Sequence, residues 1–398
     1  MVNEVLDAAR GEALKALDRA APYGPDIDVR EYLGLRVREP AKLEIGRVEG
    51  VGIDLRRARR TAMYMQVDDR VVESLSRLSG VEVTTVEDFI GNYPDIAREL
   101  LWRLIKPGQD KYTAIAALKG VGGYYVRVKR GVKVSEPIQT CLFMASEGLQ
   151  APHNLVILEE GAEATIVTGC TIMPEVFGLH AGITEFYVME GAKLSYVMIH
   201  AWNRGTHVRP RSAALLEDRA SMVMYYMNLS RVKTLQTYPK VILKGNGSKV
   251  YASSIVLGRG GSVVDVGTEA VMVGDAASEL VSRFVVKDRS RAWARARVSG
   301  VRGRGHIECK GLILSSKAAL YSVPELGGTG RDVMLTHEAS IGRIAEEEIA
   351  YLVSKGFSRE EAEELIVRGF MNVEVRGLTG RMESYVKNVV RLMSRAAM

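Results

Sequence analysis

The chain has 398 residues, of which 47% are apolar and 26% charged, and its net charge is +6. This composition describes a globular protein with enough apolar residues for a large core, and it excludes an intrinsically disordered chain. The 54 basic residues are dispersed among 48 acidic ones without a basic block, which is typical of a solvated surface rather than of a nucleic-acid-binding protein.

The N-terminus lacks the basic start and apolar stretch of a signal peptide, and no apolar run approaches the roughly eighteen residues needed to cross a bilayer. We therefore expect a cytoplasmic protein without membrane association. The cysteines Cys141, Cys170 and Cys309 are far apart and form no Cys-x-x-Cys pair. This spacing indicates free thiols rather than a disulfide framework or a stable zinc site.

The first region, residues 1–120, mixes helical and extended patterns. Residues 5–10 and 94–101 have the apolar spacing of helices, whereas residues 81–84 alternate as a strand does. The pattern predicts an N-terminal α+β domain over residues 1–120.

From residue 122 the pattern changes to short strands separated by turns of Gly, Asp, Asn and Ser. Similar segments begin at Gly161, Gly191, Asp218, Gly247 and Asp275, with spacings of 30, 27, 29 and 28 residues. A steady repeat of strands and tight turns predicts a right-handed parallel β-helix over residues 121–330, in which each coil packs its inward side chains on the next. A β-sandwich would also give short strands, but without this steady spacing.

After about residue 330 the pattern turns helical, and a C-terminal helical domain is predicted over residues 331–398. One helix is expected over residues 344–354, followed by a second whose Ser358 and Glu361 form a capping box. A last helix is expected over residues 382–398. The apolar residues on one face of this last helix are Val386, Val389, Val390 and Met393.

Several short motifs lie along this pattern. They are Gly-Val-Lys-Val at residues 131–134 with Pro-Ile-Gln at 137–139, Glu-Glu-Gly-Ala-Glu at 159–163, Gly-Cys-Thr at 169–171 with Leu-His-Ala at 179–181, and His-Glu-Ala at 337–339. Together they resemble the SufB/SufD family, the β-helical scaffold subunits of the Suf iron–sulfur cluster assembly machinery, over residues 111–370. SufD-type members are typically poor in the matching cysteines, so the chain resembles a SufB-type protein.

The resemblance implies that Cys309 is a ligand of a transient iron–sulfur cluster, of 4Fe-4S or 2Fe-2S type, with Glu338 as a second ligand. His337 points the other way in an extended segment and would serve a partner subunit. Without the resemblance, Cys309 would be read as a small core residue and the His-Glu pair as surface residues. A carboxylate or imidazole co-ligand makes a cluster more labile than four thiolates do, which suits a scaffold that releases its product.

For Cys170, which follows Gly169 at a predicted turn, the resemblance implies sulfur transfer. It would receive a persulfide from a cysteine desulfurase or another sulfur donor, with the β-helix interior as the route to Cys309. A buried structural thiol is the alternative. Cys141 is interpreted as core packing and His180 as a structural histidine. His200 stands where the family usually has glutamine, whose hydrogen bonds it could replace.

The resemblance also implies partners. In the family the C-terminal helices bind the ABC-type ATPase SufC, and the chain lacks a Gly-x-x-x-x-Gly-Lys-Ser/Thr motif, so ATP hydrolysis would be supplied in trans. The residues expected at this contact are Arg343, Ile344, Ile349, Leu352, Leu365 and Ile366. One chain offers too few ligands for a cluster, so a second copy or a SufD-like subunit would complete the site. Apo iron–sulfur proteins would receive the product.

Other functions stay open at this point. A SufD-like structural partner would dimerise and bind SufC without holding a cluster. A β-helical carbohydrate-active enzyme would need acids clustered in a groove for calcium or acid–base chemistry, whereas the acids here are spread over the turns. A hexapeptide-repeat acyltransferase would need a six-residue period, which is absent. We therefore expect an assembly scaffold rather than an enzyme.

Overall fold

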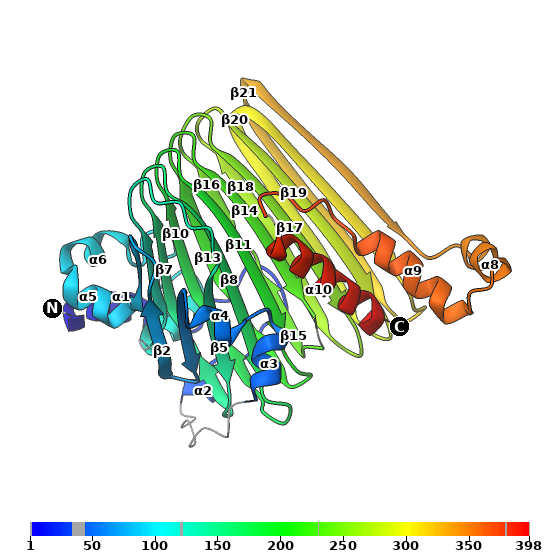
Figure 1. The fold of residues 1–398 in the computed structure, drawn as a ribbon, viewed down its shortest axis with the longest axis horizontal. Helices are drawn as coiled ribbons and strands as arrows, with labels where there is room; N and C mark the ends of the chain where they lie inside the picture. Colours follow the sequence, from blue (N-terminus) through cyan, green and yellow to red (C-terminus); the bar gives the residue numbers. More distant parts are fainter. Residues whose placement is uncertain (1, 34–43, 120–121, 230, 379, 398) are drawn as a thin grey trace.

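The computed structural model describes residues 2–33, 44–119, 122–229, 231–378 and 380–397 (Figure 1). The helices there are α1 (Val2–Ala13), α2 (Arg30–Leu33), α3 (Ile45–Gly50), α4 (Leu55–Ala58), α5 (Val86–Asn92), α6 (Pro94–Leu100), α7 (Lys111–Lys119), α8 (Glu346–Ser354), α9 (Arg359–Met371) and α10 (Arg381–Ala397).

The strands are β1 (Ala62–Val67), β2 (Arg70–Ser76), β3 (Val81–Thr85), β4 (Tyr124–Val128), β5 (Ile138–Met144), β6 (Gly148–Gln150), β7 (His153–Leu158), β8 (Glu163–Ile172), β9 (Gly178–His180), β10 (Ile183–Val188), β11 (Lys193–Ala201), β12 (Thr206–Val208), β13 (Arg211–Leu216), β14 (Ser221–Asn228), β15 (Thr234–Thr237), β16 (Lys240–Leu243), β17 (Lys249–Gly258), β18 (Val263–Met272), β19 (Ala276–Val286), β20 (Arg291–Ile313) and β21 (Ala319–Gly342).

The strands stack into a parallel β-helix of about eight turns, which confirms the predicted fold class (Figure 1). Wall A runs through β5, β8, β11, β14, β17, β19, β20 and β21. Wall B runs through β4, β7, β10, β13, β16, β18, β20 and β21. Wall C runs through β6, β9, β12, β15 and β18. In the last coils β20 and β21 each span walls A and B, so the β-helix ends in two long neighbouring strands.

The predicted repeat is confirmed by the strand register. Glu163, Lys193, Ser221, Lys249 and Ala277 are stacked neighbours, which gives coil lengths of 30, 28, 28 and 28 residues. The uneven 27 and 29 of the sequence arose because Asp218 lies one residue before the true equivalent of the turn glycines. Arg219 takes the left-handed position there, with φ of 55°, where Gly161 and Gly191 have φ of 67° and 66°.

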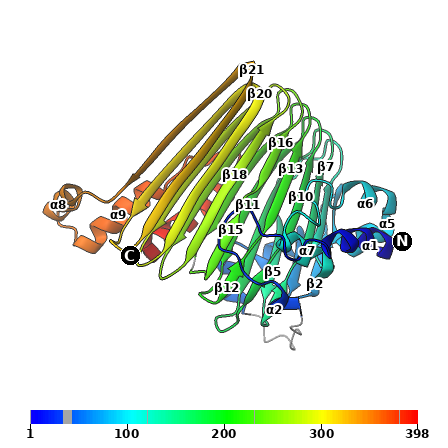
Figure 2. The ribbon, with the colours of Figure 1, turned by 180° about the vertical axis from the view of Figure 1, so that it is seen from behind.

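The N-terminal region is joined to the first coil. β1 pairs in parallel with β5, and β3 pairs antiparallel with β4. Helices α1, α5, α6 and α7 lie at this end of the β-helix (Figure 2) and share an apolar cluster with wall B. The predicted helix at 94–101 and strand at 81–84 are confirmed as α6 and β3.

The helical C-terminal region begins later than predicted. Residues up to Gly342 form β21, which pairs with β20 almost throughout, from Arg291–Ala319 to Leu312–Gly342. Helix α8 therefore begins at Glu346, while the capping box of Ser358 and Glu361 at the start of α9 is confirmed. Helix α10 lies along the outer face of wall A, and α8 stands apart from the β-helix (Figure 1). The predicted buried face of α10 is confirmed for Val386, Val389, Val390 and Met393.

Alternation along the strands divides the core into an interior and outer layers. Inward side chains of the coils, including Phe186, Val256 and Phe284, fill the β-helix interior. Outward side chains of wall A form a second cluster with α9 and α10. In the described part of the chain, every helix is too short or too polar to span a bilayer.

Candidate functional site

Cys170 lies within β8 and not at a turn, which corrects the sequence prediction. Alternate residues of β8 point inward, and Cys170 is fully buried in the interior cluster with Ile166 and Ile172. Gly169 suggested a turn, but it faces outward, where a Cβ would lie only 2.5 Å from a methyl carbon of Val51. The glycine therefore makes room for close packing on wall A rather than breaking the strand.

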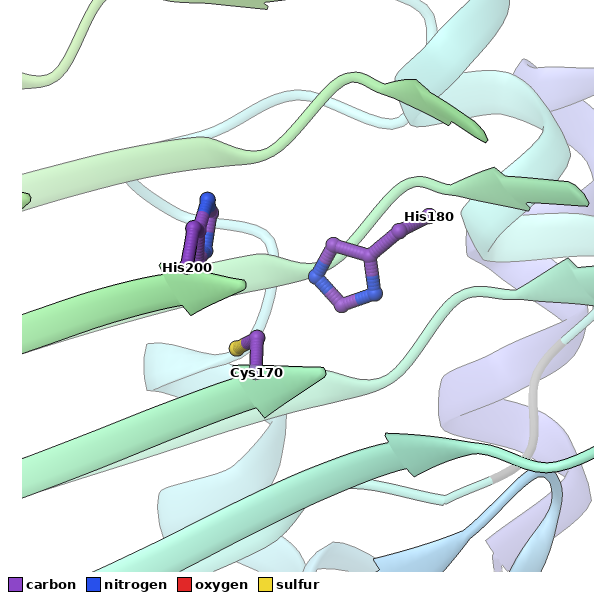
Figure 3. A group of neighbouring side chains, drawn as sticks. All are labelled: Cys170, His180 and His200. Atoms are coloured by element: carbon purple, nitrogen blue, oxygen red, sulfur yellow. The ribbon is translucent and has the colours of Figure 1, made fainter. Parts of the chain in front are cut away.

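The interior brings two histidines to Cys170, each from another strand (Figure 3). His200 in β11 is the direct register neighbour of Cys170 in the next coil, and His180 ends β9 in wall C. One side-chain nitrogen of each histidine and the sulfur of Cys170 all lie within 4.8 Å of one another. This group of three is referred to below as the Cys/His cluster.

Hydrogen bonds to the far side of each ring orient the histidines. Gln150 Nε2 donates to the carbonyl of Phe143 at 3.0 Å, so Gln150 Oε1 is turned toward His180 Nδ1, 3.0 Å away. The Nδ1 of His200 lies 3.0 Å from the hydroxyl of Tyr226. Among the described residues, the buried Nε2 of His200 has no hydrogen-bond partner.

Burial keeps the Cys/His cluster uncharged. It lowers the pKa of His180 to about 3, and burial together with neighbouring His180 lowers the pKa of His200 well below its usual value. Burial also raises the pKa of the Cys170 thiol. Two neutral imidazoles and a thiol form a set of soft and borderline ligands, and the thiol becomes nucleophilic only when it loses its proton.

Cys309 lies in β20, as predicted, and also points into the β-helix interior, where it is 2% exposed. Burial raises the pKa of its thiol, while the hydroxyls of Ser282 and Ser322 act in the opposite direction. Ser282 is its register neighbour in β19. Both proposed sulfur-handling thiols thus belong to the same interior.

A line of polar side chains connects the two thiols along wall A. Tyr226, Ser254, Ser282 and Cys309 are successive register neighbours, about 14 Å from first to last by strand spacing. Tyr226 contacts His200 of the Cys/His cluster. Two adjoining cavities accompany this line: one is lined by Tyr226 and Ser254, and the next by Ser254 and Ser282.

His337 and Glu338 lie in β21, at the exposed end of the β-helix. His337 pairs with Ile307 and Ala339 pairs with Cys309, so His337 shares the inward face of Cys309. Glu338 pairs with Glu308 on the outward face, where Lys310 lies 3.2 Å from Glu338 and 3.0 Å from Glu308. Within one chain the imidazole, rather than the carboxylate, is on the thiol's side.

The residues expected at a partner contact have mixed exposure. Arg343 is exposed and Ile349 is buried. Ile344, Leu352, Leu365 and Ile366 are half-buried. Other apolar side chains of this region are more exposed: 61% for Tyr351, 44% for Val353 and 41% for Phe357. Helix α8 therefore offers an apolar surface that the sequence prediction had not singled out.

The sequence prediction missed His200 as a member of a potential ligand set and treated His180 as structural. The three members come from β8, β9 and β11, so no local spacing links them. The signal that could have found them was the repeat itself: Cys170 and His200 are 30 residues apart, one coil length. Cys141 was interpreted correctly as packing, because it lies in the outer cluster of wall A.

Residues 142–370 match the family model described as "SUF system FeS cluster assembly, SufBD core domain". An iron–sulfur cluster assembly SufBD family protein of Archaeoglobus fulgidus is 38% identical over 352 residues, covering 88% of this chain and 95% of the relative. A protein of the same description from Methanothermobacter thermautotrophicus is 34% identical over 397 residues, covering 95% and 97%. The iron–sulfur cluster assembly protein SufB of Bacillus subtilis is 30% identical over 299 residues, covering 73% and 64%.

Proposed function

The chain belongs to the SufB/SufD family of Suf iron–sulfur cluster assembly proteins, and we propose that it is a SufB-type scaffold on which a nascent cluster is built. The observation that carries this proposal is the interior polar line that joins the Cys/His cluster to Cys309 through Tyr226, Ser254 and Ser282. A purely structural β-helix would favour apolar side chains at these inward positions.

Cys170 is the proposed sulfur acceptor and Cys309 the proposed site of assembly. Sulfur delivered as a persulfide carries no negative charge of its own until it is reduced, so two electrons from a thiol or flavin donor are needed to release it as sulfide. Hydrosulfide is small, and the hydroxyl-lined cavities between Tyr226 and Ser282 suit its passage. Because Cys170 is fully buried, the donor reaches it only when the wall of the β-helix opens.

The cluster is the cargo of this scaffold, and its proposed ligands are Cys309, His337 and Glu338. Since Glu338 lies on the opposite face of β21 from Cys309, we propose that these residues meet around a cluster only after the end of the β-helix is rearranged at an interface. In the described structure β21 pairs with β20 alone and exposes Met334 and Ile341. A long edge strand of this kind is suited to pairing with a second copy or a SufD-like subunit.

The ATPase SufC is the proposed driver of that rearrangement. Helices α8 and α9 would bind it through Arg343, Ile344, Ile349, Leu352, Leu365 and Ile366, together with the exposed Tyr351, Val353 and Phe357. Closure of two SufC subunits on ATP would then twist the two β-helices and open the 2%-exposed Cys309 to iron and, later, to acceptor apoproteins. The proposed place of action is the cytoplasm.

The test is anaerobic reconstitution of the purified chain with SufC, ATP, ferrous iron, sulfide and reductant, followed by visible absorption and Mössbauer spectra. The wild type and Cys141→Ala, whose thiol packs in the outer cluster, should both form a cluster. Cys309→Ser should form none. An equal cluster in Cys309→Ser and wild type would refute the scaffold proposal and leave a SufD-like structural role.

A further inference from the structure

The Cys/His cluster has the features of a metal site, quite apart from any role of Cys170 in sulfur transfer. Its sulfur and two imidazole nitrogens converge within 4.8 Å from three different strands. All three side chains are held by the rigid walls of the β-helix rather than by loops (Figure 3). Rigid placement of this kind lowers the conformational entropy lost when a ligand binds.

The tautomer of His180 leaves a lone pair for a ligand. The amide of Gln150 is oriented by its donation to the Phe143 carbonyl, so its oxygen accepts from His180 Nδ1. In a neutral imidazole with a protonated Nδ1, the Nε2 carries the free lone pair. A hydrogen bond from the non-coordinating nitrogen to an amide or carbonyl oxygen is the usual outer partner of a metal-bound histidine.

His200 supplies the second, independent observation. Its side chain is fully buried, its Nδ1 is engaged by Tyr226, and among the described residues its Nε2 has no hydrogen-bond partner. A buried polar atom without a partner costs free energy, and coordination of a cation at Nε2 would remove that cost.

We propose that Cys170, His180 and His200 bind one divalent first-row transition-metal ion, such as ferrous or zinc ion, with a fourth coordination position left open. On binding, the S–H bond of Cys170 breaks, its proton leaves to solvent, and a sulfur–metal bond forms without any change in oxidation state. The ligand atoms of a loaded tetrahedral site lie about 3.5 Å apart, so the side chains must close by up to about 1 Å.

Charge favours an anion at the open position. One thiolate cancels only one of the two positive charges of the ion, and the two imidazoles are neutral. An unbalanced charge is costly in an interior lined by residues such as Ile166 and Trp202. Hydrosulfide is an anion of suitable softness, so the metal and a persulfide would compete for the one sulfur atom of Cys170.

Cobalt(II) is the probe for this site, because tetrahedral thiolate coordination gives intense visible bands and a thiolate charge-transfer band. The full chain is produced in cobalt-supplemented medium, since the site is sealed, and purified anaerobically. Cobalt content and absorption are then compared among wild type, Cys170→Ser, His200→Gln and the matched control Cys309→Ser. Glutamine can keep a hydrogen bond to Tyr226, and circular dichroism checks that each variant is folded.

The proposal predicts one tightly held cobalt ion per chain in wild type and in Cys309→Ser. The charge-transfer band should be lost in Cys170→Ser, and the bound cobalt reduced at least tenfold in His200→Gln. Absence of tetrahedral bands from the wild type, or an unchanged spectrum in folded Cys170→Ser, would overturn it. Loss of the bands in Cys309→Ser would place the metal elsewhere and also overturn it, whatever the outcome of cluster reconstitution.

Discussion

The two thiols occupy contrasting parts of one β-helix. Cys170 lies in a middle coil, closed by neighbouring coils on both sides and covered outside by α3 and the loop after it. Cys309 lies one strand from the end, beside β21, whose residues from Thr336 to Gly342 are all exposed. The middle coil fixes side chains by burial, whereas the end leaves potential ligands free to meet a partner.

The contrast should appear first in stability. Phe284 is fully buried in the interior, so Phe284→Ala should lower the free energy of unfolding by about 3–5 kcal/mol. Met334 on β21 is 57% exposed, and Met334→Ala should change it by no more than about 0.5 kcal/mol. Chemical denaturation measures both, and similar losses in the two variants would show that the end of the β-helix is as tightly packed as its middle.

A second prediction concerns pH and the closed part of the β-helix. Burial, with Arg209 and Lys233 nearby, lowers the pKa of His207 to about 4. Below the ordinary value of 6.5 the unfolded chain therefore binds a proton that the folded chain does not, so stability falls with falling pH until about pH 4. The limiting slope is about 1.4 kcal/mol per pH unit for one such group.

Replacing that group isolates its part of the slope. His207→Gln should remove about 1 kcal/mol per pH unit between pH 6 and 4, measured by denaturation at several pH values. The absolute stability of the variant is not the readout, since the ring also contacts Tyr32 and bonds to Thr234. An unchanged slope would mean that His207 titrates alike in the folded and unfolded chains.

The smallest effect on stability should come from the exposed end. Glu308 and Glu338 raise the pKa of Lys310, but the Glu338 side chain is 58% exposed, so Glu338→Gln should alter the free energy of unfolding by no more than about 0.5 kcal/mol. The same variant should release a reconstituted cluster to a chelator several-fold faster than wild type. Unchanged release kinetics would remove Glu338 from the ligand set.

Much of the fold could be predicted because the repeat is written in consecutive turns and alternating strands. The capping box of α9 and the buried face of α10 are also local patterns, and both are confirmed. The region of residues 331–342 was wrongly predicted to be helical, because its strand character comes from pairing with distant β20 rather than from its own alternation.

The candidate site was less predictable for the same physical reason. Cys309 and Cys170 were identified by resemblance, but the Cys/His cluster depends on register between coils, and His180 comes from a different wall. The face shared by Cys309 and His337 likewise follows from the pairing of Ile307 with His337. Side-chain neighbours across coils are set by the length of every intervening turn, which a motif does not reveal.

The central claim is that the two thiols act in series through the interior. Mass spectrometric mapping of sulfur, after incubation of the chain with SufC, a cysteine desulfurase and isotopically labelled cysteine, tests it most directly. Labelled sulfur should be found on Cys170 and Cys309 of wild type and only on Cys170 of Cys309→Ser. Cys170→Ser should carry none on Cys309. Full labelling of Cys309 in a folded Cys170→Ser variant would contradict the claim and show that sulfur enters at the open end.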